Sequence, residues 1–146
     1  MNRRSNVRPS LMRAGLLLVA GLALSGAARA DALDECYRKA LNNTEVVPCL
    51  EAARKHAEAE MMAANRRVEA MLVELERQTA MKTLAASVRK AQAAFTPYMN
   101  AQCKLVEATF ASGGGSGKAG LACQVDLLRA RTAELDKLAP PAARQP

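Results

Sequence analysis

Aromatic residues are almost absent from this chain. Its 146 residues include no tryptophan and only four aromatic side chains, those of Tyr37, Phe95, Tyr98 and Phe110. A hydrophobic core must therefore be filled mainly by alanine, leucine, methionine and valine, which favours closely packed helices over a sheet. Glycine is also missing between Cys49 and Thr109, and that stretch has a single proline, Pro97. Since glycine and proline interrupt helices most strongly, long helices are expected there.

Histidine is limited to one residue, His56, which leaves little for catalysis. We expect His56 on a charged helical face, with no free cysteine to serve as its nucleophile. Glu58 and Glu60 are two residues apart, so a helix points them away from each other and they form a poor acid–base pair. The sequence therefore predicts that the chain is not an enzyme.

The sequence also has no motif for a metal or a nucleotide. The close C-x-x-C pairs of structural zinc sites are absent, so we expect no metal. The run from Gly113 to Lys118 resembles a phosphate-binding loop but departs from it at both ends. Ser112 stands where a glycine is needed, and Ala119 stands where a hydroxyl residue should follow the lysine. We expect neither a nucleotide nor another cofactor.

The first 30 residues have the composition of a signal peptide. An apolar run, Ala14 to Leu24, follows a basic start without acids and precedes the small-residue sequence Ala28-Arg29-Ala30. We therefore predict cleavage before Asp31 and a periplasmic or secreted product. The apolar run has about eleven residues and a membrane-spanning helix needs about twenty, so no stable membrane insertion is expected after cleavage.

Positive charge is concentrated in this leader. Residues 1–30 carry five arginines and no acid, so the rest of the chain has sixteen basic and fourteen acidic residues and a net charge of +2 instead of +7. A protein that binds nucleic acid typically carries a basic patch or stripe. The mature chain has no arginine-rich block, so we expect no nucleic-acid partner.

Four cysteines in an exported chain indicate two disulfides. Cys36 and Cys49 lie on either side of one predicted helix break, and Cys103 and Cys123 lie on either side of another. Pairing these neighbours is the simplest of the three possible connectivities. In the chain-entropy model each such bond stabilises the fold by about 3 kcal/mol.

Capping and breaking residues divide the mature chain into helices. A short helix capped by Asp31 or Asp34 is expected through Leu41, followed by a break at residues 42–44. The next helix begins at Pro48, or earlier at Thr44, and the long helical stretch after it should break near residues 78–83. The expected buried stripe of the third helix comprises Leu84, Val88, Ala91, Phe95, Tyr98, Leu105 and Phe110. That of the last helix comprises Leu121, Val125, Leu128, Leu135 and Leu138.

These elements predict an all-α fold for residues 31–138. The expected architecture is a small antiparallel bundle or hairpin of three to four helices, stapled by two disulfides, with a disordered tail at residues 139–146. The third helix is expected to end near Ala111 and the last to begin near Leu121. Five glycines fall in residues 112–120, which predicts a flexible reversal. Ser116 and Lys118 in this reversal are candidate partner-binding residues.

The order of these features resembles the LprI-type lysozyme-inhibitor domain family, whose members are small exported bacterial helical domains. The residues that carry the likeness are the first cysteine pair, the segment from Ala91 to Phe95, Tyr98 with Cys103, and the ending from Cys123 to Leu135. The resemblance covers most of the mature chain.

The resemblance implies an exported protein-binding module of the cell envelope that inhibits lysozyme or binds another envelope protein. A lysozyme cleft carries a carboxylate pair, to which Ser116 and Lys118 would present a hydroxyl and an ammonium. The alternative is a structural or chaperone-like periplasmic module without lysozyme activity. It would contact partners through an adaptable methionine surface, formed by Met61, Met62, Met71, Met81 and Met99.

Overall fold

A computed structural model describes residues 31–110 and 115–139. Within these residues the chain forms four helices and no strand: α1 (Ala32–Lys39), α2 (Val46–Gln78), α3 (Leu84–Thr109) and α4 (Ser116–Leu138). The predicted all-α fold is confirmed. The predicted signal peptide, part of the predicted reversal and all but the first residue of the predicted tail lie outside the described residues.

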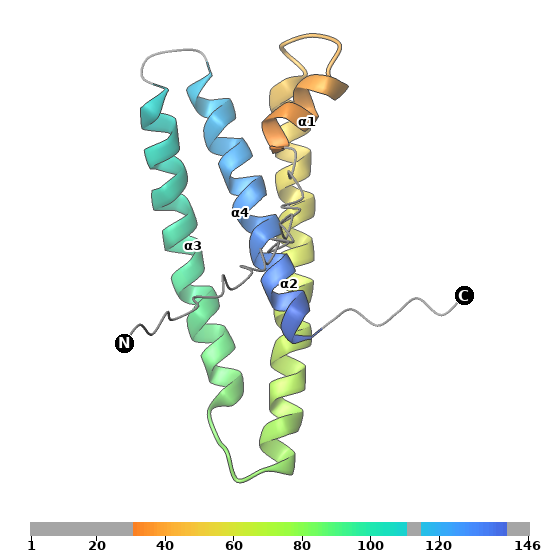
Figure 1. Cartoon of the computed structure of the whole chain (residues 1–146), viewed down its shortest axis with the longest axis vertical. Coiled ribbons are helices and arrows are strands. Elements are labelled where there is room, and N and C mark those ends of the chain that lie inside the picture. The colour runs from red at the N-terminus through yellow and green to blue at the C-terminus, as the bar shows by residue number, and fades with distance from the viewer. Residues whose placement is uncertain (1–30, 111–114, 140–146) are drawn as a thin grey trace, which may run out of the picture.

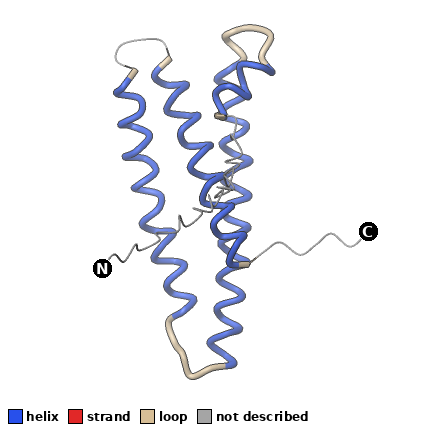
Figure 2. The backbone as a smooth tube through the Cα atoms, in the orientation of Figure 1, coloured by secondary structure: helices blue, strands red, loops and turns tan. Residues whose placement is uncertain are grey.

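The helices form an elongated antiparallel bundle (Figure 1). α2 runs the length of the molecule, α3 returns beside it, and α4 runs back between them along part of their length (Figures 1 and 2). The most extensive contact is between α2 and α4, and the short α1 packs on both of these helices at one end. The far ends of α2 and α3 extend beyond α4 as a two-helix hairpin.

Local side chains explain where the first helices begin and end. The Asp31 carboxylate accepts a hydrogen bond from the Leu33 backbone N–H at 2.9 Å and so caps α1. α2 begins at Val46, between the two predicted starts at Thr44 and Pro48, and Pro48 lies in its first turn. A first-turn N–H has no helical partner, so the missing N–H of proline costs little there. α2 ends before Thr79, within the predicted break.

The core is small and rich in alanine, as expected from the composition. Its largest fully buried side chains belong to α2 and α4, with Val46, Leu50, Val68, Val125, Leu128 and Leu135 among them. The predicted stripe of α4 is therefore correct except at Leu138, which is 61% exposed. α4 contributes to the core because it lies between two other helices.

The predicted stripe of α3 is wrong at Ala91 and over most of its second half. Ala91, Tyr98, Leu105 and Phe110 are exposed, whereas Ala85, Val88 and Cys103 are buried and Phe95 and Met99 pack partly against the core. The expected positions recurred about every 3.5 residues, but an α-helix has 3.6 residues per turn. That difference accumulates to about 20° per heptad, so the predicted stripe rotates away from the core along a long helix.

The start of α4 also differs from the prediction. α4 begins at Ser116 instead of near Leu121, so residues 116–120 of the predicted reversal are helical, Gly117 and Gly120 among them. A Cβ atom added at Gly120 would overlap the Glu107 side chain of α3, whereas one added at Gly117 meets nothing within 4 Å. Gly120 thus permits the close approach of α4 to α3.

This difference between the two glycines gives a stability prediction. Gly120→Val should lower the free energy of unfolding by about 1–3 kcal/mol, because the added atoms force Glu107 aside in a packed interface. Gly117→Val should change it by less than about 0.5 kcal/mol, since the site faces open space. Urea denaturation of both variants measures the difference. Equal stabilities would show that the α3–α4 contact does not require a glycine at position 120.

Candidate functional site

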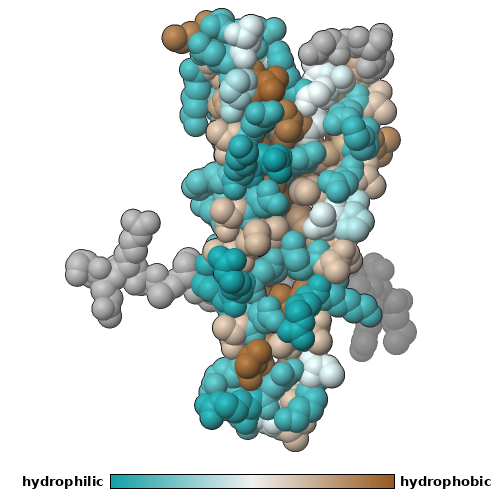
Figure 3. All heavy atoms as spheres, turned by 180° about the vertical axis from the view of Figure 1, so that it is seen from behind, coloured by the Kyte–Doolittle hydropathy of each residue, from teal (hydrophilic) through white to brown (hydrophobic). Residues whose placement is uncertain are grey.

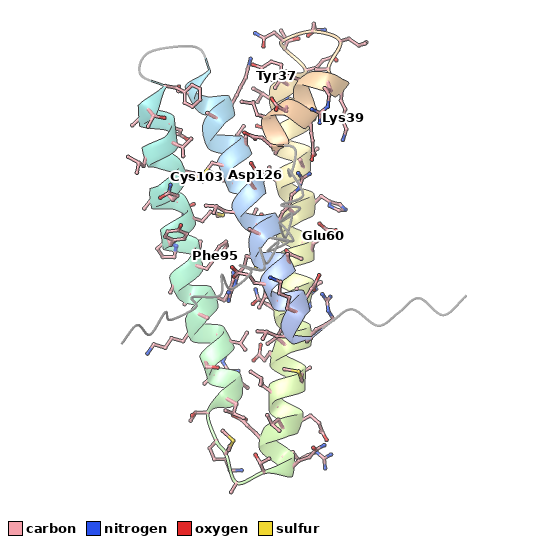
Figure 4. The ribbon with its side chains drawn as sticks, in the orientation of Figure 1. Tyr37, Lys39, Glu60, Phe95, Cys103 and Asp126 are labelled. Carbon is pink, nitrogen blue, oxygen red and sulfur yellow. A yellow bond between two sulfur atoms is a disulfide. The ribbon has the colours of Figure 1, made fainter. Side chains whose placement is uncertain are left out.

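Both disulfides lie at the same end of the bundle. Cys36 in α1 is bonded to Cys49 in α2, with the Cα atoms 5.7 Å apart, and Cys103 in α3 is bonded to Cys123 in α4, with the Cα atoms 5.5 Å apart. The predicted pairing is confirmed, and no cysteine is free. We call this region the disulfide-linked end, comprising residues 32–50, 103–110 and 115–123 (Figure 4). The opposite end, where residues 79–83 join α2 to α3, has no such link.

The loop between α1 and α2 is held by the carboxylate of Glu45. One oxygen of Glu45 accepts from the Leu41 backbone N–H at 2.9 Å, and the other accepts from the Asn42 side chain at 3.0 Å. The Asn42 side-chain oxygen in turn accepts from the Thr44 backbone N–H at 3.0 Å. Together with the Glu45 backbone N–H, which donates to the Asn42 carbonyl oxygen at 3.2 Å, these bonds fix the backbone of the loop.

Leu41 projects from this loop into solvent. Its side chain is 92% exposed, more than any other large hydrophobic residue in the described chain. Tyr37 and Phe110 are also about half exposed at this end, and hydrophobic residues, drawn brown, are visible there in Figure 3. The prediction that the first helix reaches Leu41 is wrong, because α1 ends at Lys39. An exposed leucine on a fixed loop offers apolar surface that a partner could bury.

Lys118 joins the first turn of α4 to the α1–α2 region. Its ammonium donates to the Asn43 side-chain oxygen, lies 3.5 Å from the Tyr37 hydroxyl, and sits 5.5 Å from the centre of the Tyr37 ring. Ser116 is the first residue of α4 and is half-buried. The two predicted partner-binding residues therefore lie on an ordered helical turn. Tyr37, Leu41 and Asn43 complete this surface and were not predicted.

A second feature is an acidic groove of about 740 Å³ between α1, α2 and α4. Arg129 crosses it and donates to both carboxylate oxygens of Glu35, at 3.1 and 2.9 Å. These hydrogen bonds hold the pKa of Glu35 below its ordinary value. The groove is lined by one guanidinium and five carboxylates, those of Asp31, Glu35, Glu60, Asp126 and Asp136.

Asp126 of α4 lies in an environment that disfavours its charged form. Burial raises its pKa from an ordinary value of 3.8 to about 6, and the neighbouring Asp31 carboxylate adds to the rise. The Ala32 backbone N–H, which donates to Asp126 at 3.2 Å, acts in the opposite direction. Figure 4 shows Asp126 on α4 beside the start of α1.

The remaining polar residues do not form a reactive constellation among the described residues. His56 is exposed and pairs only with Glu60, at 3.2 Å, on the surface of α2. No group of three or more possible metal ligands occurs in the described parts of the chain. None of the described helices is long and apolar enough to cross a membrane.

Comparison with protein families finds a match over most of the described chain. The family model described as lysozyme inhibitor LprI matches residues 36–135, from the first cysteine to the last buried leucine of α4. The chain belongs to the LprI family. The LprI match contains both disulfides and nearly the whole core. Comparisons with curated proteins and with solved structures find no match.

Proposed function

We propose that the mature chain is an exported, non-catalytic inhibitor of lysozyme that binds the enzyme through its disulfide-linked end. The observation that carries this proposal is the 92% exposed Leu41 on a loop fixed by Glu45 beside the Cys36–Cys49 bond. Membership of the LprI family supplies the class of partner.

Rigidity supports the choice of this end. Ordering one flexible residue on binding costs roughly 1 kcal/mol or more, so a binding surface that is already ordered retains more of its interaction energy. Here one disulfide fastens α1 to α2 and the other fastens α3 to α4. Lys118 then connects the two pairs through Asn43 and Tyr37.

The chemistry of the surface also suits a lysozyme cleft. Lysozymes hydrolyse glycans with a pair of carboxyl groups in an open cleft. Leu41 offers an apolar anchor, and the Lys118 ammonium brings a positive charge to the same end of the inhibitor. An ammonium near that carboxylate pair is attracted to it and blocks access of the substrate.

A structural or chaperone-like role is the second candidate, supported by exposed methionines. Met62, Met71 and Met81 are each about half exposed along α2 and the loop that follows it. Such side chains adapt to partners of different shape. Pulldown from envelope extract with the mature protein tests this role, and loss of the captured partner in a Met62, Met71 and Met81 triple alanine variant would support it.

A cell-wall turbidity assay with mature protein tests the inhibitor proposal. Clearing of the cell-wall suspension by lysozyme should slow in proportion to inhibitor concentration and saturate at one inhibitor per enzyme. Unchanged clearing at a large molar excess of the folded protein would overturn the proposal.

Within the disulfide-linked end, the charge of Lys118 should matter more than the hydroxyl of Ser116. Lys118→Ala should weaken inhibition about tenfold, corresponding to about 1.4 kcal/mol, since a charge near the enzyme carboxylates is lost. Ser116→Ala should weaken it less than about twofold, because Ser116 opens the helix without adding charge. Inhibition constants from the turbidity assay give both values.

Lys118→Met serves as the matched control for this pair. It keeps the aliphatic stem that lies near Tyr37 and removes only the charge, so it should lose as much inhibition as Lys118→Ala. Circular dichroism of each variant checks that helix content is preserved. If all three variants inhibit like wild type, the contact surface lies elsewhere on the helices.

A further inference from the structure

A backbone hydrogen bond joins the first residue of α1 to α4, one helical turn from the Arg129–Glu35 ion pair. The N–H of Ala32, a residue that is 0% exposed, donates to the Asp126 carboxylate at 3.2 Å. The preceding residue, Asp31, places its own carboxylate on the Leu33 N–H as the cap of α1. Two carboxylates therefore lie side by side where α1 meets α4.

The charges around Asp126 do not balance. The charged groups that line the groove with Asp126 are Asp31 and Glu35 from the α1 region, Glu60 from α2, and Arg129 and Asp136 from α4. The one cation among them, Arg129, already donates to both oxygens of Glu35. Burial contributes most to the raised pKa of Asp126, and the Asp31 carboxylate adds to it, while the Ala32 N–H and Arg129 offset the rise only in part.

Cleavage at the predicted site supplies a positive charge at this position. Hydrolysis of the bond between Ala30 and Asp31 consumes one water, leaves a carboxylate on the leader and leaves an amine on Asp31. That amine is protonated at neutral pH. Consecutive backbone nitrogens lie within about 4 Å of each other, so the new ammonium is close to the Ala32 nitrogen that already bonds Asp126.

We propose that removal of the leader completes the fold: the α-ammonium created on Asp31 pairs with the Asp126 carboxylate and fastens α1 to α4. In the precursor the same nitrogen is an uncharged amide and cannot form this ion pair. A free ammonium at a helix N-terminus opposes the helix dipole, so a nearby carboxylate is needed to neutralise it. The pairing requires cleavage after Ala30 but is independent of lysozyme binding.

The test compares the mature form that begins at Asp31 with a form that carries two extra glycines before Asp31. In the mature form the pKa of the α-amino group should rise from roughly 8 to about 9, followed through the ¹³C shifts of Asp31. Asp126→Asn should return it to roughly 8. Asp34→Asn, which removes an exposed acid from the same turn of α1, should leave it raised.

Thermal melting gives an independent measure. The mature form should melt about 3 °C above the two-glycine form at pH 7, and Asp126→Asn should remove this difference. In the two-glycine form, the raised pKa of Asp126 gives a stabilisation that is present below about pH 4 and is lost as the pH rises through about 6. In the mature form this decline should be absent.

Three results would overturn the proposal. The first is an exported protein whose intact mass shows an N-terminus other than Asp31. The second is an ordinary α-amino pKa in the mature wild-type protein. The third is equal melting temperatures for the mature and two-glycine forms. This comparison needs no substitution at Asp126, so it remains decisive even if Asp126→Asn does not fold. None of these measurements depends on lysozyme inhibition.

Discussion

Leu41→Asp should weaken lysozyme inhibition by at least about thirtyfold, corresponding to about 2 kcal/mol. The leucine is 92% exposed in the free protein, so the substitution removes no core contact. A complex that buries position 41 would have to desolvate the introduced carboxylate beside the acids of the enzyme cleft, which opposes binding. The inhibition constant from the turbidity assay measures the loss, and the melting temperature should stay within a few degrees of wild type.

Met81→Asp is the matched control for this substitution. Met81 is 55% exposed in the loop between α2 and α3, at the opposite end of the bundle. The same change of an exposed apolar side chain to a carboxylate there should leave inhibition within about twofold of wild type. If Met81→Asp loses inhibition and Leu41→Asp does not, the binding surface lies at the opposite end of the bundle from the one we propose.

Removal of either disulfide should cost about 3 kcal/mol of unfolding free energy. The bond that closes 20 residues should contribute about 0.4 kcal/mol more than the one that closes 13, because loop-closure entropy grows slowly with length. Guanidinium denaturation of the Cys36→Ser/Cys49→Ser and Cys103→Ser/Cys123→Ser double variants measures both losses. A loss below about 1 kcal/mol for both would contradict a fold that depends on these bonds.

The two double variants should differ in their inhibition. The Cys36–Cys49 bond fastens the helix before Leu41 to the helix after it, so its loss frees the loop that carries Leu41. Inhibition measured at low temperature, where both variants remain folded, should fall more for Cys36→Ser/Cys49→Ser. The Cys103–Cys123 variant should retain more activity, since Glu45 still fixes the α1–α2 loop.

Short-range chemistry made the helix count and the disulfide pairing predictable. Asn42 to Thr44 and residues 78–83 interrupt the apolar repeat, and each cysteine pair flanks a predicted break. The face of α3 was not predictable in the same way. A small error in the assumed helical repeat moved Tyr98 and Leu105 from the expected core to the surface.

The candidate site could be predicted only in part. Lys118 was identifiable as the one charge in a glycine-rich segment, but its partners Tyr37 and Asn43 are 81 and 75 residues away. Contacts over such distances depend on how the helices pack, which no local pattern encodes. Gly120 was interpreted as part of a flexible segment. Its close contact with Glu107 of α3 also depends on helix packing, so the sequence alone did not show it.

The most direct test is a nuclear magnetic resonance titration of the ¹⁵N-labelled mature protein with lysozyme. Binding through the disulfide-linked end predicts that the largest amide shifts or losses of signal fall in residues 37–45 and 115–120. Residues 71–88, at the opposite end, should be unchanged. Perturbations centred on residues 71–88, or none at saturating lysozyme, would contradict the proposal that this end of the bundle is the inhibitory surface.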